Sequence, residues 1–131
     1  MEIIHKKINF EDKRGIITDI FTNDCKDHAA IIFSKKGAVR GNHYHKESTQ
    51  YTFVVSGQLT MLSQKVDGGE IEKNILEPND LMVHFPMESH ALIADKDTFF
   101  LAFVDGVRGG DNYEKDTYRL EVPLEKKYKG K

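Results

Sequence analysis

The chain consists mostly of short segments rich in β-branched and aromatic residues, and each segment ends at a cluster of Gly, Asn, Asp or Pro. Such segments are typical of β-strands joined by tight turns. Asp67-Gly68-Gly69, for example, separates two of them and favours a hairpin. No long stretch has the 3.6-residue period of an amphipathic helix. About ten short strands with turns roughly every 8–12 residues predict an all-β protein, built as an antiparallel sandwich or barrel.

The expected strands cover most of the chain. At 131 residues it has the length of one domain, and we expect residues 1–131 to form a single domain. The apolar or alternating segments that predict strands are residues 16–21, 29–33, 51–55, 59–66, 71–76, 81–85, 90–94 and 98–104, with a last strand at 117–122.

Charge and cysteine content narrow the classes of function. The net charge is −2, from 19 basic and 21 acidic side chains. This balance argues against a basic protein surface that binds nucleic acid or an anionic membrane. Cys25 is the only cysteine, which excludes an intrachain disulfide and fits a reducing compartment. The chain has neither an apolar run of about 18 residues nor the residue order of a signal peptide at its N-terminus. We therefore expect a soluble cytoplasmic protein.

Three histidines and a glutamine form the pattern with the clearest chemical meaning. His43 and His45 alternate on one strand, so their side chains point to the same face, roughly 6.6 Å apart along the backbone. Gln50 begins the next strand, and His90 follows a turn that contains Pro86. An isolated His-x-His motif more often lies on a solvent-exposed strand and has no function. The surrounding glycines, the proline and the third histidine favour four side chains that converge in one cavity.

This frame resembles the cupin motifs. Residues 37–57 are similar to the first motif, G(X)5HXH(X)3,4E(X)6G, with Gln50 in place of the usual Glu. Residues 80–90 are similar to a degenerate second motif, G(X)5PXG(X)2H, one residue shorter before His90. The resemblance implies a double-stranded β-helix, which is a small jelly-roll-like barrel with its site at the mouth. It also implies a homodimer.

A narrower resemblance concerns two groups of sugar-nucleotide cupins. Residues 40–44 are similar to the R-G-x-H-Y segment of dTDP-4-dehydrorhamnose 3,5-epimerases, and residues 43–50 to the H-x-H-K-x-x-x-Q segment of dTDP-sugar 3,4-ketoisomerases. Residues 12–15 resemble their D-x-R-G turn, and residues 112–119 resemble a late segment of the same proteins. The chain departs from the epimerases in being shorter and in carrying His45 where they have Gln.

The resemblance implies an isomerase, either an epimerase or a ketoisomerase. Its substrate would be a nucleotide-linked 4-keto-6-deoxy sugar, its pathway surface-polysaccharide or deoxysugar biosynthesis, and its reaction would need no metal. A neutral imidazole suits removal of a proton beside a ketone, because its ordinary pKa lies close to neutral pH. His43 is the expected base, and His45 a second proton carrier or a group that positions a substrate oxygen. Three other residues are expected to bind the substrate: Arg40 binds its diphosphate, and Gln50 and His90 contact the rest of it. Tyr113 is the expected proton donor. His84 lies at an apolar position and is expected to be a core residue.

Two alternatives remain open from the residues themselves. Three imidazoles can hold a divalent metal such as Fe, Mn, Ni or Zn, and Gln50 could be a weak fourth ligand beside His43, His45 and His90. Replacing Glu by Gln removes a negative charge and weakens such a site without abolishing it. The barrel could also bind a sugar without catalysis, with the histidines serving only as hydrogen-bonding groups.

Overall fold

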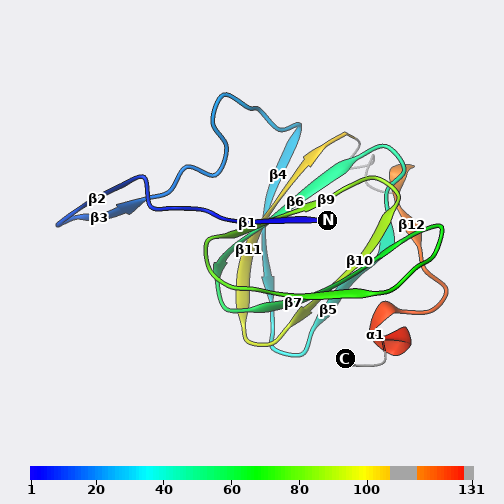
Figure 1. The fold of residues 1–131 in the computed structure, drawn as a ribbon. Helices are drawn as coiled ribbons and strands as arrows, with labels where there is room; N and C mark the ends of the chain where they lie inside the picture. The colour runs from blue at the N-terminus through cyan, green and yellow to red at the C-terminus, as the bar shows by residue number, and fades with distance from the viewer. Residues whose placement is uncertain (107–114, 129–131) are drawn as a thin grey trace.

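The computed structural model describes residues 1–106 and 115–128, which form two five-stranded antiparallel sheets and a separate hairpin (Figure 1). The first sheet has the order β1-β9-β6-β11-β4 and the second the order β12-β5-β10-β7-β8. The strands are β1 Glu2–His5, β2 Phe10–Asp12, β3 Gly15–Ile17, β4 His28–Ser34, β5 Val39–Tyr44, β6 Thr49–Ser56, β7 Leu59–Lys65, β8 Glu72–Leu76, β9 Asp80–His84, β10 Glu88–Ala94, β11 Thr98–Asp105 and β12 Tyr118–Arg119; helix α1 is Leu124–Lys127.

From β4 to β12 the chain passes repeatedly between the two sheets, and only β7 and β8 are consecutive neighbours in one sheet. This exchange between facing sheets is the jelly-roll arrangement, so the predicted all-β cupin fold is confirmed. Most of the expected strands lie within a few residues of the observed ones. Among the described residues, no helix has the length and hydropathy needed to cross a membrane.

Two expected strands are much shorter than predicted. The segment expected at 16–21 pairs only at Gly15–Ile17, because the chain then turns back and Phe21 packs edge-on against Tyr51 and Phe103. The segment expected at 117–122 pairs only at Tyr118–Arg119. Pro123 follows soon after it and has no N–H to donate to a neighbouring strand.

The inward faces of both sheets are apolar at one end of the barrel and polar at the other. On β10 the inward side chain is His90 first, followed by Leu92 and Ala94 in the hydrophobic core. On β6 the same order runs from Gln50 to Val54. The core residues are Val54, Leu59, Met61, Leu76, Met82, Leu92, Ala94 and Phe100. The apolar end holds the sheets together, and the polar end of the same strands is available for chemistry.

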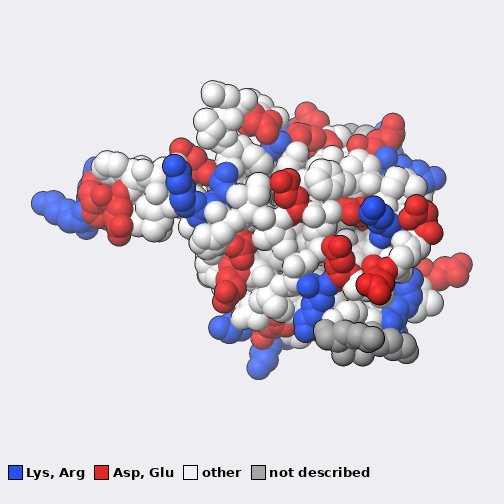
Figure 2. Space-filling view, viewed as in Figure 1, with Lys and Arg blue, Asp and Glu red and all other residues white. Residues whose placement is uncertain are grey.

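The hairpin of β2 and β3 projects away from the barrel (Figures 1 and 2). Its apolar side chains are exposed, and Phe10, Ile16 and Ile17 are each more than half accessible to solvent. Acidic and basic side chains are interspersed over the face of the molecule in Figure 2, so this face presents no extended patch of one sign.

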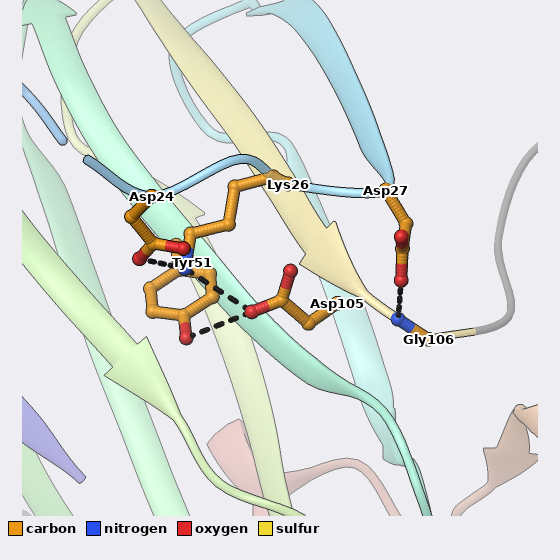
Figure 3. Close-up of polar contacts among 6 residues, drawn as sticks. All are labelled: Asp24, Lys26, Asp27, Tyr51, Asp105 and Gly106. Atoms are coloured by element: carbon orange, nitrogen blue, oxygen red, sulfur yellow. Dashed lines mark hydrogen bonds and ion pairs between the residues drawn. The ribbon is translucent and has the colours of Figure 1, made fainter. Parts of the chain in front are cut away.

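Lys26 fixes the segment that returns from this hairpin to the barrel (Figure 3). Its ammonium group bonds to Asp24 at 2.6 Å and to Asp105 at 3.1 Å, and it lies 4.1 Å from the centre of the Tyr51 ring. Burial alone would lower the pKa of Lys26, but the two carboxylates raise it, so the side chain stays charged. The Asp27 carboxylate accepts a hydrogen bond from the N–H of Gly106. These contacts join the segment before β4 to the end of β11.

Candidate functional site

Four imidazole rings lie in contact at the polar end of the barrel. The ring centres of His84 and His90 are 4.5 Å apart, and those of His90 and His43 are 4.8 Å apart. His45 lies 5.0 Å from His43 and 5.7 Å from His90. All four residues are buried. The rings come from β9, β10, β5 and the residue just after β5, so both sheets contribute to the cluster.

Gly41 allows β5 to place His43 beside His90. The pairing of β5 with β10 has an irregularity between His90 and Ala91, and His43 lies opposite His90 there. Gly41 has a φ of +89°, and a Cβ at this position would lie 2.7 Å from the carbonyl oxygen of His90. Only glycine fits both the backbone angle and the close approach. The glycine two residues before His43 is therefore part of how the site is built.

His45 is held by two partners. Its Nδ1 lies 2.7 Å from the main-chain oxygen of Asp116, and its Nε2 lies 3.3 Å from Oε1 of Gln50. Gln50 is itself buried on β6. Gln50 was expected on the strand next to that of His45, pointing into the same cavity; it lies within hydrogen-bonding distance of His45, but β5 and β6 belong to different sheets.

His84 is a buried, hydrogen-bonded histidine, as expected for a core residue, but its ring also contacts His90. Its Nε2 lies 2.9 Å from Oγ1 of Thr52. Burial first, and then His45, the charged N-terminus and His43, lower the pKa of His84 to about 3. The ring is therefore neutral at pH 7. His84 is expected from the sequence to lie outside the site, whereas the structure adds it to the imidazole cluster.

His90 is the most enclosed member of the cluster. Neither of its ring nitrogens forms a hydrogen bond of ordinary geometry with a described residue. Burial first, and then His84, His43 and His45, lower its pKa well below the ordinary value, although the Glu88 backbone acts in the opposite direction. His90 is thus neutral at pH 7, and a neutral imidazole has one nitrogen lone pair to offer. Buried polar atoms without partners are uncommon and point to a function or a ligand.

A cavity of about 280 Å³ opens beside the cluster. Its polar lining includes His43, Gln50 and His90, and its apolar lining includes Leu92 and Phe100. A larger hollow of about 670 Å³ lies between the β7–β8 hairpin and the end of α1, but its lining includes no histidine. We take the smaller cavity as the candidate site, because the buried, mutually close titratable groups lie there.

Two arginines line the same cavity. Arg40 donates from Nε to Oγ of Ser34 at 2.7 Å and from Nη2 to the carbonyl oxygen of Phe33 at 3.0 Å. Arg119 lies opposite His43 in the pairing of β12 with β5. Arg40 was expected in the site, and Arg119 was not singled out. Tyr113, the expected proton donor, lies outside the described residues.

The cluster also has the donor set of a metal site. One ring nitrogen from each of His43, His45 and His90 lies within 4.8 Å of the others. The hydrogen bond from His45 Nδ1 to a backbone oxygen is the arrangement that commonly orients a metal-binding imidazole. These three residues fit a divalent ion, and Gln50 lies beside them.

The fold and this end of the barrel define the class of protein, which is a cupin with a histidine-lined cavity. Within that class, the chain belongs to the family described as the polysaccharide biosynthesis C-terminal domain, whose model matches residues 10–117. No curated protein matches the chain by sequence.

Solved structures of sugar-nucleotide cupins are similar to this chain. The dTDP-4-dehydrorhamnose 3,5-epimerase from Sulfolobus tokodaii is 25% identical with a TM-score of 0.73, over 82% of this chain and 71% of that one. The capsular polysaccharide assembling protein CapF from Staphylococcus aureus is 28% identical with a TM-score of 0.63, over 89% of this chain but only 33% of CapF. The 3,4-ketoisomerase QdtA from Thermoanaerobacterium thermosaccharolyticum, solved with TDP, shares the fold with a TM-score of 0.75 at 20% identity, over 92% and 88% of the two chains.

Proposed function

We propose that the protein is an isomerase that acts on a nucleotide-linked 4-keto-6-deoxy sugar in polysaccharide or deoxysugar biosynthesis. The observation that carries the proposal is the cluster of buried imidazoles beside a cavity, in a chain of the polysaccharide biosynthesis family. The similarity to a dTDP-4-dehydrorhamnose 3,5-epimerase supports the substrate class. Epimerisation and ketoisomerisation share the first step, which is removal of a proton from a carbon beside the ketone.

In the proposed reaction His43 accepts that proton. The electrons of the C–H bond move toward the ketone oxygen and give an enediolate. Return of a proton to the same carbon on the other face gives the epimer. Return of a proton to the former ketone carbon, while the proton of the neighbouring hydroxyl passes to the former ketone oxygen, gives the isomeric ketone. His45 is the second proton carrier, and Gln50 and His90 contact the substrate oxygens. A hydrogen-bond donor near the ketone oxygen lowers the barrier, because negative charge develops there.

The size of the cavity fits a substrate whose sugar ring lies inside the cavity and whose diphosphate lies at its mouth. At about 280 Å³ it is smaller than pockets that enclose drug-sized ligands, which run from about 300 to 1,000 Å³. It suits one sugar ring better than a whole nucleotide sugar, so the diphosphate would lie at the mouth. Arg40 lines that cavity, and a guanidinium can bind phosphate oxygens through two hydrogen bonds.

Proton exchange tests the proposal directly. The purified protein is incubated in heavy water with a dTDP-linked 4-keto-6-deoxy sugar, and NMR follows deuterium at the carbons beside the ketone. We expect incorporation at one or both positions, well above the rate without protein. Tight binding of the sugar nucleotide without any exchange would contradict the enzymatic proposal and favour a sugar-binding protein.

A metal-dependent cupin enzyme is the second candidate, and the three ring nitrogens within 4.8 Å favour it. His43, His45 and His90 would hold the ion. A bound divalent ion would supply a Lewis acid that polarises a carbonyl oxygen. Elemental analysis of protein purified without added ions separates the candidates, because a stoichiometric ion is expected only for the metal-dependent enzyme.

We also propose a homodimer, which two exposed apolar surfaces support. Ile31 is 67% exposed on the outer face of the first sheet, and Phe33 and Phe99 pack together beside it. The projecting hairpin presents Ile16 and other apolar side chains. Contiguous apolar surface of this kind commonly marks an interface, and two-fold dimers are the most common soluble assemblies.

Light scattering checks the assembly. We expect a mass near twice the 15.0 kDa of the chain at micromolar concentration. Ile16→Glu or Ile31→Glu is expected to shift the mass toward the monomer. Ile75→Glu is the matched control, because Ile75 is 44% exposed on β8 of the other sheet. A wild-type protein that scatters only as a 15.0 kDa species would contradict the dimer.

A further inference from the structure

We propose that Asp116 is the positioning residue of His45, and that it fixes a proton on Nδ1 so that Nε2 is the ring nitrogen left to face Gln50 and the rest of the site. The inference rests on the proposed function only for its effect on turnover. The position of the proton on the ring follows from the contacts of the two residues and can be measured separately.

The main-chain oxygen of Asp116 determines which nitrogen carries the proton. It lies 2.7 Å from Nδ1 of His45, and both residues are buried. A carbonyl oxygen only accepts hydrogen bonds, so Nδ1 must donate. The hydrogen bond at one ring nitrogen thus sets the state of the other. In the neutral ring, Nε2 keeps the lone pair.

The carboxylate of Asp116 holds that oxygen in place. It accepts hydrogen bonds from the backbone N–H groups of Lys46 at 2.9 Å, Glu47 at 3.1 Å and Ser48 at 2.8 Å. Burial alone would raise the pKa of Asp116, but these donors hold it below its ordinary value, so the carboxylate is charged at neutral pH. Hydrogen bonds to a charged acceptor are roughly twice as strong as neutral ones.

The two sets of contacts close a loop around His45. The three N–H groups belong to the residues that directly follow His45, and the carbonyl oxygen of the same aspartate binds its ring. One residue therefore fixes both the backbone beside His45 and the direction of its imidazole. The segment that contains Asp116 continues into β12, which pairs with β5 beside His43.

The Gln50 contact shows which ring nitrogen of His45 faces the site. Nε2 of His45 lies 3.3 Å from Oε1 of Gln50. Two acceptors do not bind each other, so either the amide turns its NH₂ group toward the ring or Nε2 carries a second proton. In both arrangements Nδ1 donates to the main-chain oxygen of Asp116, so Nε2 is the nitrogen that faces the site. This makes His45 suited to return a proton to the substrate after His43 has removed one.

Nitrogen-15 NMR of the histidine rings tests the proton position in the wild-type protein. In its neutral form we expect His45 to be protonated at Nδ1 and unprotonated at Nε2. A wild-type His45 protonated only at Nε2 would overturn the inference, whatever the activity of the protein. If the protein shows no proton exchange with any keto sugar, the proposed function fails, while this spectrum still tests the role of Asp116.

Asp116→Asn tests the coupling. The substituted amide can offer only one acceptor oxygen to three N–H groups, so His45 is expected to lose its fixed Nδ1–H form. We expect kcat for exchange to fall by about 10–100-fold, the range found when the partner that orients a metal-bound imidazole is removed, with KM nearly unchanged. Asp116→Glu, which keeps the charge, should recover part of the loss. Unchanged kcat and an unchanged ring proton in Asp116→Asn would overturn the inference.

Asp95→Asn is the matched control. The Asp95 carboxylate accepts from Gln58 at 3.1 Å and Thr60 at 2.7 Å, and the residue follows the apolar end of β10. It should lower stability without changing the His45 ring or kcat. If Asp116→Asn does not fold, Ser48→Ala replaces it, because the Ser48 side chain also hydrogen-bonds to this carboxylate. A smaller fall in kcat with a shift in the His45 spectrum is then expected, and wild-type values of both would contradict the role of Asp116.

Discussion

Replacing His43 by Asn is expected to slow proton exchange into the keto sugar by at least about 100-fold, and by up to about 10,000-fold, the range that a positioned general base contributes. Asparagine keeps similar size and some hydrogen bonding but cannot accept a proton at neutral pH. His43 is buried beside His90 and lines the cavity, so the substitution removes the group that would take the proton from the substrate. The measurement is deuterium incorporation at saturating substrate.

The control for this variant is His5→Asn. The His5 side chain is 70% exposed on β1, where it pairs with Asp80. It should exchange at the wild-type rate and bind the nucleotide normally. Nucleotide binding by His43→Asn should also stay close to wild type, because the diphosphate is expected to contact Arg40. If His43→Asn exchanges as fast as the wild type, the assignment of His43 as the base is wrong.

The parts of the site that lie close together in sequence could be predicted. His43 and His45 point the same way because residues of an extended chain alternate, and Gly37 and Gly57 mark the tight turns before β5 and after β6. The cupin resemblance added His90 from the second motif. These features are local in sequence, or belong to a motif with fixed spacing, so no three-dimensional information was needed.

The parts that depend on pairing between distant strands were missed. His84 lies in an apolar strand and looks like a core residue until the register of β6 and β9 places it opposite Gln50. Asp116 is 71 residues from His45, and nothing in the spacing of the two indicates their hydrogen bond. The resemblance of residues 112–119 to other sugar-nucleotide cupins marked the segment, but not which of its atoms would meet the site.

The predicted strand at 16–21 failed for a different reason. Ile16, Ile17, Ile20 and Phe21 have the composition of a buried strand. In the structure Ile16 and Ile17 are more than half exposed in the hairpin, and Phe21 packs on the outside of the barrel. An apolar residue can cover a barrel or a partner chain as well as fill a core, and composition does not distinguish these uses. In the proposed homodimer, the partner chain would cover the exposed Ile16 and Ile17.

Replacing His90 by Asn decides between the two candidate functions. In the metal-free reaction His90 only orients the substrate. We expect exchange to slow by up to about 100-fold, because misplacing a bound substrate by about 1 Å can cost that much, and this loss is smaller than the largest loss expected for His43→Asn. The wild-type protein should also keep its activity after dialysis against a chelator. If His90 holds a divalent ion, the variant loses both the ion and all activity, because removing one of three imidazoles breaks the ligand set.

Two measurements keep the outcomes of this experiment distinct. Elemental analysis reports the ion content of the wild type and of His90→Asn, and it does not depend on the substrate chosen. Thermal unfolding separates loss of function from loss of fold, because His90 is 1% exposed and its replacement disturbs a closely packed cluster. His84→Asn is the matched variant, since His84 contacts His90 but does not belong to the group of three close ring nitrogens. A chelator that silences the wild type, together with an ion that is lost in His90→Asn and retained in His84→Asn, would establish the metal-dependent enzyme and refute the metal-free one.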